Sequence, residues 1–188
     1  LAYLGIFIVL LSSLIGIITG CQQPFQPGSF TDDLGREVRI EKAPQRIVSH
    51  VPGITEILFA LGLDERIVGV SEYCDYPEAA KAKPKIGDFF NPSIERIVDS
   101  NPDLVFTNGS VDYVMTQLDS LGINYIVLDP EDIDGILRDI ELVGEVTGTG
   151  KKAGEVIEDM RDRMARVSAR VRDAPRVKTF YTFATTDL

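Results

Sequence analysis

Few side chains in this sequence are of the types that carry out chemistry. His50 is the only histidine among 188 residues, and the cysteines are Cys21 and Cys74. A protein-bound zinc or manganese ion needs several His, Cys or carboxylate ligands, and no His-rich tract is present. We therefore predict no metal site and expect His50 to be a hydrogen-bonded structural residue. The alternatives are that it faces a ligand cleft or acts as the base for a bound cofactor.

The sequence also lacks the motifs of common enzyme classes. Thr147-Gly148-Thr149-Gly150 lies between two predicted helices, whereas a phosphate-binding glycine loop follows a strand. There is no Gly-x-Ser-x-Gly nucleophile elbow, and the sequence spacing suggests no histidine partner for Cys74. We therefore predict no catalytic residues and no enzyme activity, and expect Cys74 to be a small, partly buried side chain.

The balance of charges argues against nucleic acid as a partner. The formal net charge is −10, with 29 acidic and 19 basic residues. A surface of this sign repels phosphate backbones and anionic lipid headgroups. An acidic face remains suited to docking on basic residues of another protein.

The first 20 residues form an apolar leader without a charged side chain. It ends in Ile18-Thr19-Gly20-Cys21, which resembles the lipobox of bacterial lipoproteins. That resemblance implies cleavage before Cys21, acylation of its thiol and an extracytoplasmic location on a membrane. The alternative is that the leader stays as a membrane-spanning helix, for which its length suffices. Residues 21–29 are polar and contain Pro and Gly, as expected of a tether.

Residues 30–130 alternate between short apolar strands and amphipathic helices. A predicted hairpin, residues 30–42, comes first. Four predicted strands follow, at residues 46–49, 66–70, 104–106 and 125–128. This order predicts an α/β fold, a Rossmann-like lobe whose parallel sheet has helices on both faces. Ligands of such sheets bind beyond the carboxyl ends of the strands, which here are residues 49–52, 71–75 and 107–110.

A short helix is predicted to begin at Asn91-Pro92. Asn91 suits the N-cap, and Pro92 suits the first helical position because its missing N–H has no partner there. Glu95 then falls in the first helical turn.

Residues 131–174 are predicted to form two connecting helices, with the break at residues 148–150. Pro175 ends the second helix, and residues 177–183 read as a new strand without a following partner. We interpret residues 175–188 as the start of a second lobe that continues beyond this sequence.

Several of these stretches together resemble the class of ABC-transporter substrate-binding proteins that capture cobalamin and iron–siderophore complexes. The resemblance rests on residues 46–62 (RIVSHVPGITEILFALG), 68–77 (VGVSEYCDYP), 85–98 and 101–106. It is strongest to the cobalamin-binding members, through the Tyr-x-Asp-Tyr-Pro loop and the aromatic residue before the Glu-bearing helix. It implies two α/β lobes bridged by a rigid helix, a cobalt corrinoid or ferric chelate clamped between them, and delivery to a membrane permease.

The resemblance also implies roles for four residues. Pro52 and Tyr73 would lie on cleft-lining loops after the first and second strands. Phe89 would stand where cobalamin-binding relatives place an aromatic ring against the corrin, although a tryptophan is familiar there. Glu95 would pair with an arginine of the permease. The alternatives are that Phe89 belongs to the core, that either Tyr73 or Tyr76 is structural, and that Glu95 merely stabilises its helix terminus. A lipid-anchored interaction module without a ligand site is the remaining alternative.

Overall fold

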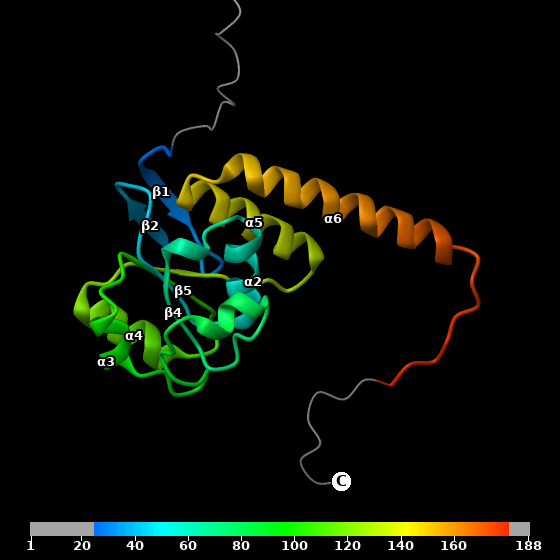
Figure 1. Ribbon diagram of the computed structural model, residues 1–188. Helices are drawn as coiled ribbons and strands as arrows, with labels where there is room; N and C mark the ends of the chain where they lie inside the picture. The colour runs from blue at the N-terminus through cyan, green and yellow to red at the C-terminus, as the bar shows by residue number, and fades with distance from the viewer. Residues whose placement is uncertain (1–24, 181–188) are drawn as a thin grey trace, which may run out of the picture.

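The computed structural model describes residues 25–180, and its centre is a four-stranded parallel sheet (Figure 1). The strand order is β4-β3-β5-β6, so the chain crosses over between β4 and β5. Every residue of β3 and β5 is buried, as expected for central strands covered on both faces. The strands are β3 (Ile47–Ser49), β4 (Ile67–Val70), β5 (Leu104–Thr107) and β6 (Tyr125–Val127).

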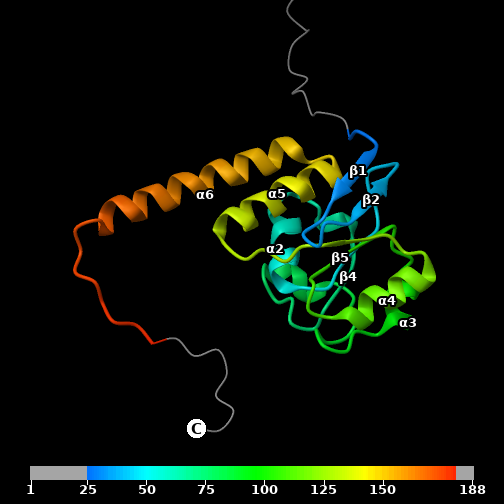
Figure 2. The ribbon, with the colours of Figure 1, turned by 180° about the vertical axis from the view of Figure 1, so that it is seen from behind.

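Helices cover both faces of this sheet, which confirms the predicted fold class (Figures 1 and 2). On one face, Leu58 and Ile140 belong to a core cluster that α2 and α5 build against the sheet. On the other face, Ile97 and Leu118 belong to a second cluster built by α3 and α4. The helices are α2 (Pro52–Ala60), α3 (Ile94–Asp99), α4 (Asp112–Leu121), α5 (Ile133–Thr147) and α6 (Gly150–Val171), with 3-10 turns at Asp64–Arg66 and Glu78–Ala82.

The predicted hairpin forms a separate two-stranded sheet, β1 (Gly28–Thr31) and β2 (Glu37–Ile40). Its turn is anchored to the edge of the main sheet by Asp32, which is 5% exposed. One oxygen of Asp32 accepts from the Val127 backbone N–H at 3.2 Å, and Arg36 donates to it at 2.8 Å. The Arg36 guanidinium also lies 3.8 Å from the centre of the Tyr125 ring.

Helices α5 and α6 pack side by side and run in opposite directions, and α6 then extends away from the lobe (Figure 1). Gly144 makes the close approach possible, since a Cβ there would lie 2.5 Å from the Cβ of Ala153. Toward its C-terminal end α6 exposes Val167 and Val171. None of the helices in residues 25–180 combines the length and apolarity needed to cross a bilayer.

The short helix α3 begins later than predicted. Ser93, not Asn91, is its N-cap, because the Ser93 hydroxyl accepts from the Arg96 N–H at 3.2 Å. Pro92 therefore precedes the helix. Asn91 instead donates its own N–H to Asp88 Oδ1 at 2.8 Å, so a turn centred on Asp88 occupies the place of the predicted first helical turn.

The predicted strand at residues 177–183 is not formed in its described part. Val177 and Phe180 are 84% and 89% exposed, and residues 175–180 have no regular secondary structure. A strand needs a neighbour for its backbone hydrogen bonds, and no described segment lies beside this one. The leader, Cys21 and residues 181–183 lie outside the described residues.

Candidate functional site

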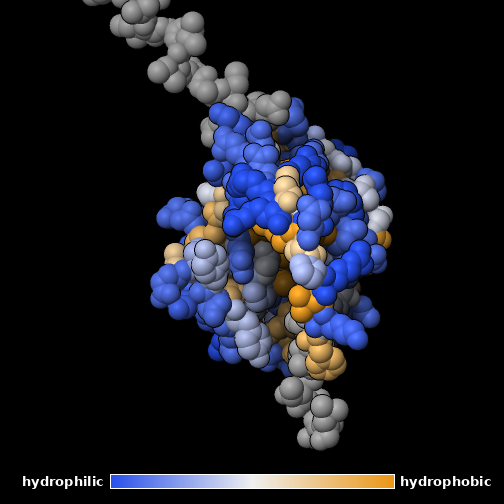
Figure 3. All heavy atoms as spheres, turned by 90° about the vertical axis from the view of Figure 1, so that its right-hand side faces the viewer, coloured by the Kyte–Doolittle hydropathy of each residue, from blue (hydrophilic) through white to orange (hydrophobic). Residues whose placement is uncertain are grey.

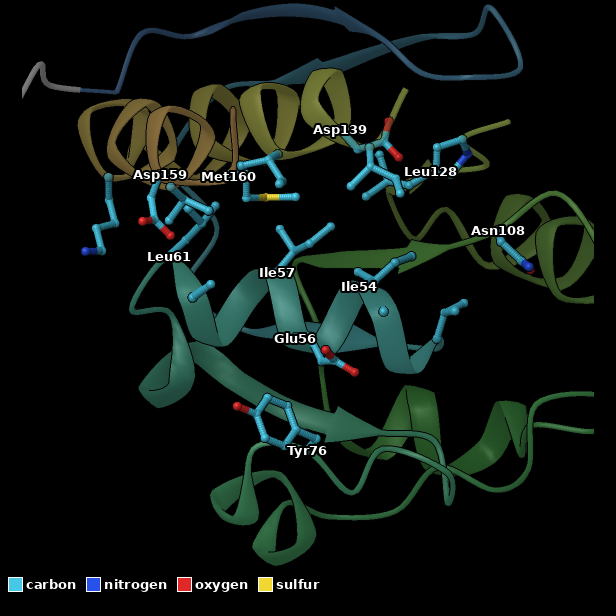
Figure 4. Close-up of a pocket in the computed structure, with 18 of the residues that line it drawn as sticks. Ile54, Glu56, Ile57, Leu61, Tyr76, Asn108, Leu128, Asp139, Asp159 and Met160 are labelled. Atoms are coloured by element: carbon cyan, nitrogen blue, oxygen red, sulfur yellow. The ribbon is translucent and has the colours of Figure 1, made fainter. Parts of the chain in front are cut away.

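A groove of about 910 Å³ opens beside the carboxyl ends of β3, β5 and β6. Ile54 and Ile57 point from α2 towards Met160 of α6, whereas Glu56 and Tyr76 lie on the other side of α2 (Figure 4). The side of the molecule towards which α6 extends is hollowed, and apolar residues show in the hollow (Figure 3). The position agrees with the site expected for a parallel sheet.

Four aromatic side chains are exposed in segments that follow the carboxyl ends of β4 and β5. Their exposed fractions are 58% for Tyr73, 67% for Tyr76, 71% for Phe90 and 57% for Tyr113. Exposed rings of this size are uncommon on a surface without a ligand or partner, and the segments that carry them begin at the edge of the sheet where ligands of such folds bind. The exposure of Phe90 and Tyr113 was not predicted from the sequence, because nothing in the local pattern distinguishes an exposed ring from a buried one.

The three residues predicted to contact ligand lie at this same edge. Pro52 is the first residue of α2, and its neighbours Val51 and Gly53 line the groove. Tyr73 is exposed on the loop after β4. Phe89 is half-buried and packs against the core cluster formed with α3 and α4. The groove itself is lined by Tyr76 rather than by these three side chains.

His50 is fully buried just after β3 and joins three segments at this edge. Its Nε2 is 2.9 Å from the carbonyl oxygen of Phe89, and its Nδ1 is 2.9 Å from the hydroxyl of Thr107. Because a carbonyl oxygen can only accept, Nε2 carries the proton and Nδ1 accepts from Thr107. Burial lowers the pKa of His50, which favours this neutral form, although the bond to Phe89 and the charge of Asp88 oppose the shift.

This arrangement leaves neither ring nitrogen of His50 free to coordinate a metal ion. Among residues 25–180, no group of three or more His, Cys, Asp or Glu side chains is arranged to hold one. His50 is therefore a hydrogen-bonded residue behind the edge and does not face the groove. Cys74 is buried rather than partly buried, and its sulfur lies 3.1 Å from the hydroxyl of Thr55 and 3.2 Å from that of Ser71.

Asp139 is an acidic residue in the groove that the sequence analysis missed. It is 2% exposed, and burial, followed by the neighbouring carboxyl of Asp33, raises its pKa to about 7. The sequence could have predicted the burial of Asp139. It lies three residues after Ile136 and one before Ile140, on the helix face that the apolar pattern assigns to the core.

Glu95 lies apart from the groove, in the first turn of α3, and is exposed. The carboxylate is placed where free backbone N–H groups favour negative charge. Its exposure also leaves it accessible to a partner protein.

A model of the periplasmic binding protein family matches residues 47–185, so the chain belongs to this family. A family of solute-binding proteins agrees with a ligand groove at the carboxyl edge of the sheet.

Two curated relatives illustrate the range of similarity. The uncharacterized ABC transporter substrate-binding lipoprotein YvrC of Bacillus subtilis is 29% identical over 187 residues, covering 89% of this chain and 59% of that protein. The vitamin B12-binding protein of Yersinia pestis is 31% identical over 149 residues, covering 78% of this chain and 53% of that protein. The chain thus spans little more than half the length of these relatives.

Solved structures support the same assignment. The periplasmic vitamin B12 binding protein BtuF of Vibrio cholerae matches with a TM-score of 0.64 and 27% identity, over 69% of this chain and 52% of that one. The periplasmic heme-binding protein RhuT of Roseiflexus sp. RS-1 matches with a TM-score of 0.64 and 30% identity, over 70% of this chain and 52% of that one. The described fold therefore corresponds to about half of such a protein.

Proposed function

We propose that this chain provides the first lobe of an extracytoplasmic lipoprotein that captures cobalamin or a related corrinoid and delivers it to an ABC importer permease. The observation that carries the proposal is the exposure of four aromatic side chains in segments that follow the carboxyl ends of β4 and β5, namely Tyr73, Tyr76, Phe90 and Tyr113. Aromatic faces pack well on a large flat macrocycle, and stacking adds to the area that is buried. Pro52 and the loop that carries Phe89 belong to the same ligand surface.

A second candidate ligand is haem or another ferric chelate. Three of the four exposed rings are tyrosines, Tyr73, Tyr76 and Tyr113. A tyrosine oxygen is a suitable ligand for ferric haem iron, whereas it has no such role towards a corrinoid whose axial positions are filled. This alternative uses the same surface.

The proposed delivery step uses Glu95 as the contact to a permease arginine. An exposed carboxylate on a lobe tip can set the register of docking and speed the encounter through long-range attraction. Acylated Cys21 would keep the protein at the membrane surface through the tether of residues 21–29. These steps make no use of a catalytic residue.

The test is titration of the complete gene product with cyanocobalamin, hemin and a ferric siderophore. Binding is detected by intrinsic fluorescence or by calorimetry. We expect submicromolar affinity for cyanocobalamin and weaker binding of the other two. Tighter binding of hemin than of cyanocobalamin would establish the second candidate. Binding of none of the three would overturn the proposal and favour an interaction module. Radiolabelled palmitate incorporation, with Cys21→Ser as the control, tests the anchor.

A further inference from the structure

Three aromatic side chains contact one another in sequence from the core to the surface at the carboxyl edge. His50 is 0% exposed, Phe89 is half-buried and Phe90 is 71% exposed. The rings of His50 and Phe89 are stacked, with centroids 5.3 Å apart and an interplanar angle of 17°. The rings of Phe89 and Phe90 meet edge to face, with centroids 4.9 Å apart.

The ring of Phe89 is therefore held by contacts within the protein. One face lies on His50, and the ring also packs against the core cluster that includes Ile86 and Ile97. Phe90 meets the Phe89 ring edge to face and leaves most of its own surface in solvent. Of the two phenylalanine rings, that of Phe90 is therefore the more accessible to a ligand.

The backbone of the same loop is held at fixed points. His50 Nε2 donates to the Phe89 carbonyl at 2.9 Å, and Thr107 orients the imidazole through Nδ1 at 2.9 Å. Asp88 Oδ1 accepts from the Phe90 N–H at 2.7 Å and from the Asn91 N–H at 2.8 Å. Because 39 residues separate His50 from Phe89, this hydrogen bond is a tertiary link between the loop and the end of β3, in addition to the apolar packing of Ile86 and Val48 in one cluster.

We infer that Phe90 is the ligand-contacting ring of this loop and that His50, acting through Phe89, is its positioning residue. The inference rests on the proposed function, with a corrin or porphyrin macrocycle as the ligand class. Holding a ring in place before binding reduces the entropy that is lost when the ligand immobilises it. A buried imidazole suits this role because it supplies both a flat face and a directed N–H group.

The experiment uses the complete gene product and two readouts. The first is the dissociation constant for cyanocobalamin and for hemin. The second is hydrogen–deuterium exchange of the peptide covering residues 86–93, measured without ligand. The variants are Phe90→Ala, Phe89→Ala, His50→Asn and His50→Gln. Leu121→Ala is the control, since Leu121 is 48% exposed at the far end of α4.

The two His50 variants form a matched pair. Glutamine places an N–H donor close to the position of Nε2, whereas asparagine is too short and reaches only the position of Nδ1. We expect His50→Asn to speed exchange in residues 86–93 by about tenfold and to weaken binding to a similar extent, as the loss of one net hydrogen bond implies. His50→Gln should stay within about threefold of the unmodified protein in both readouts.

Phe90→Ala should weaken binding of the preferred probe by at least about tenfold while leaving exchange unchanged, because only the presented ring is removed. Unchanged affinity in Phe90→Ala, with strong loss in Phe89→Ala, would overturn the assignment of Phe90. Unchanged exchange in His50→Asn would overturn the positioning role. If His50→Asn fails to fold, Thr107→Val tests the same link with His50 in place, and unchanged exchange in residues 86–93 again overturns the role.

The two proposals fail in different ways. If neither probe binds the unmodified protein, the proposed function and the ligand contact of Phe90 both fall, while the exchange readout still decides the role of His50. If a probe binds and Phe90→Ala has no effect, the proposed function stands and the assignment of Phe90 is wrong.

Discussion

Asp139 of α5 is hydrogen-bonded to Asp33 in the turn between β1 and β2, which joins the connecting helices to the hairpin. Two carboxyl groups form such a bond only when one of them carries the proton. Asp33 already accepts from the Asp129 N–H at 2.6 Å, so Asp139, whose pKa burial and Asp33 raise to about 7, is the protonated partner.

This pair predicts a pH dependence of stability. Between a pKa near 4 in the unfolded chain and about 7 in the folded protein, the folded state holds a proton that the unfolded state has released. The contribution of Asp139 is therefore fully present at lower pH and is lost as the pH rises through this window, by at most about 1.4 kcal/mol per pH unit.

Asp139→Asn should flatten this part of the pH profile. The amide can donate permanently to Asp33, so the free energy of unfolding of the variant should exceed that of the unmodified protein by more at pH 8 than at pH 5. Urea denaturation at both pH values measures the difference. If the free energy of unfolding changes equally in both proteins between pH 5 and pH 8, the assignment of the shared proton is wrong.

Removing the Asp32 carboxylate should destabilise the lobe strongly. The group is buried and accepts from Arg36 Nε at 3.0 Å, from the Arg36 N–H at 2.9 Å and from the Val127 N–H at 3.2 Å. Asp32→Ala leaves these donors unpaired and should lower the free energy of unfolding by about 3–5 kcal/mol. Glu41→Ala is the control in the same hairpin, because its ion pair with Arg39 is exposed and should contribute less than about 1 kcal/mol. Equal losses in the two variants would contradict the anchoring role.

Substitution by alanine should have opposite effects on stability at two glycines in neighbouring helices. At Gly144 the added Cβ would lie 2.5 Å from that of Ala153, so Gly144→Ala should destabilise the protein by about 1–3 kcal/mol through separation of α5 and α6. At Gly154 an added Cβ meets nothing within 4 Å, and Gly154→Ala should stabilise α6 by about 0.5–1 kcal/mol. Chemical denaturation of both variants gives the sign of each change in the free energy of unfolding. A stabilising Gly144→Ala would show that the helices are not in close contact.

Reversing the charge of Glu95 should separate ligand capture from delivery. Glu95→Lys in the complete protein should leave ligand affinity unchanged and reduce uptake by about tenfold, with the deficit depending on ionic strength. Glu65→Lys is the matched control, since Glu65 is exposed and precedes β4 at the opposite edge of the sheet. If uptake is the same for both variants, Glu95 has no role in docking and only stabilises the start of its helix.

Local patterns predicted the architecture well because they act over a few residues. The strand around Val48 and the helix around Leu58 follow from apolar runs and from a spacing of three and four residues. The start of α3 was misplaced by two residues, because Asn91 and Ser93 are both good caps and only the turn at Asp88 decides between them. The strand predicted from Val177 onward needs a neighbour that its own sequence cannot supply.

The sequence by itself therefore determined the alternation of strands and helices, the parallel sheet and the edge at which a ligand would bind. Only the tertiary structure decided that Tyr73, Tyr76, Phe90 and Tyr113 are presented while Phe89 is packed on His50, and that Asp139 meets Asp33. The reason is the range of the forces involved. Periodicity records what each element buries, whereas side chains many residues apart become neighbours only when the packed sheet brings their loops to one edge.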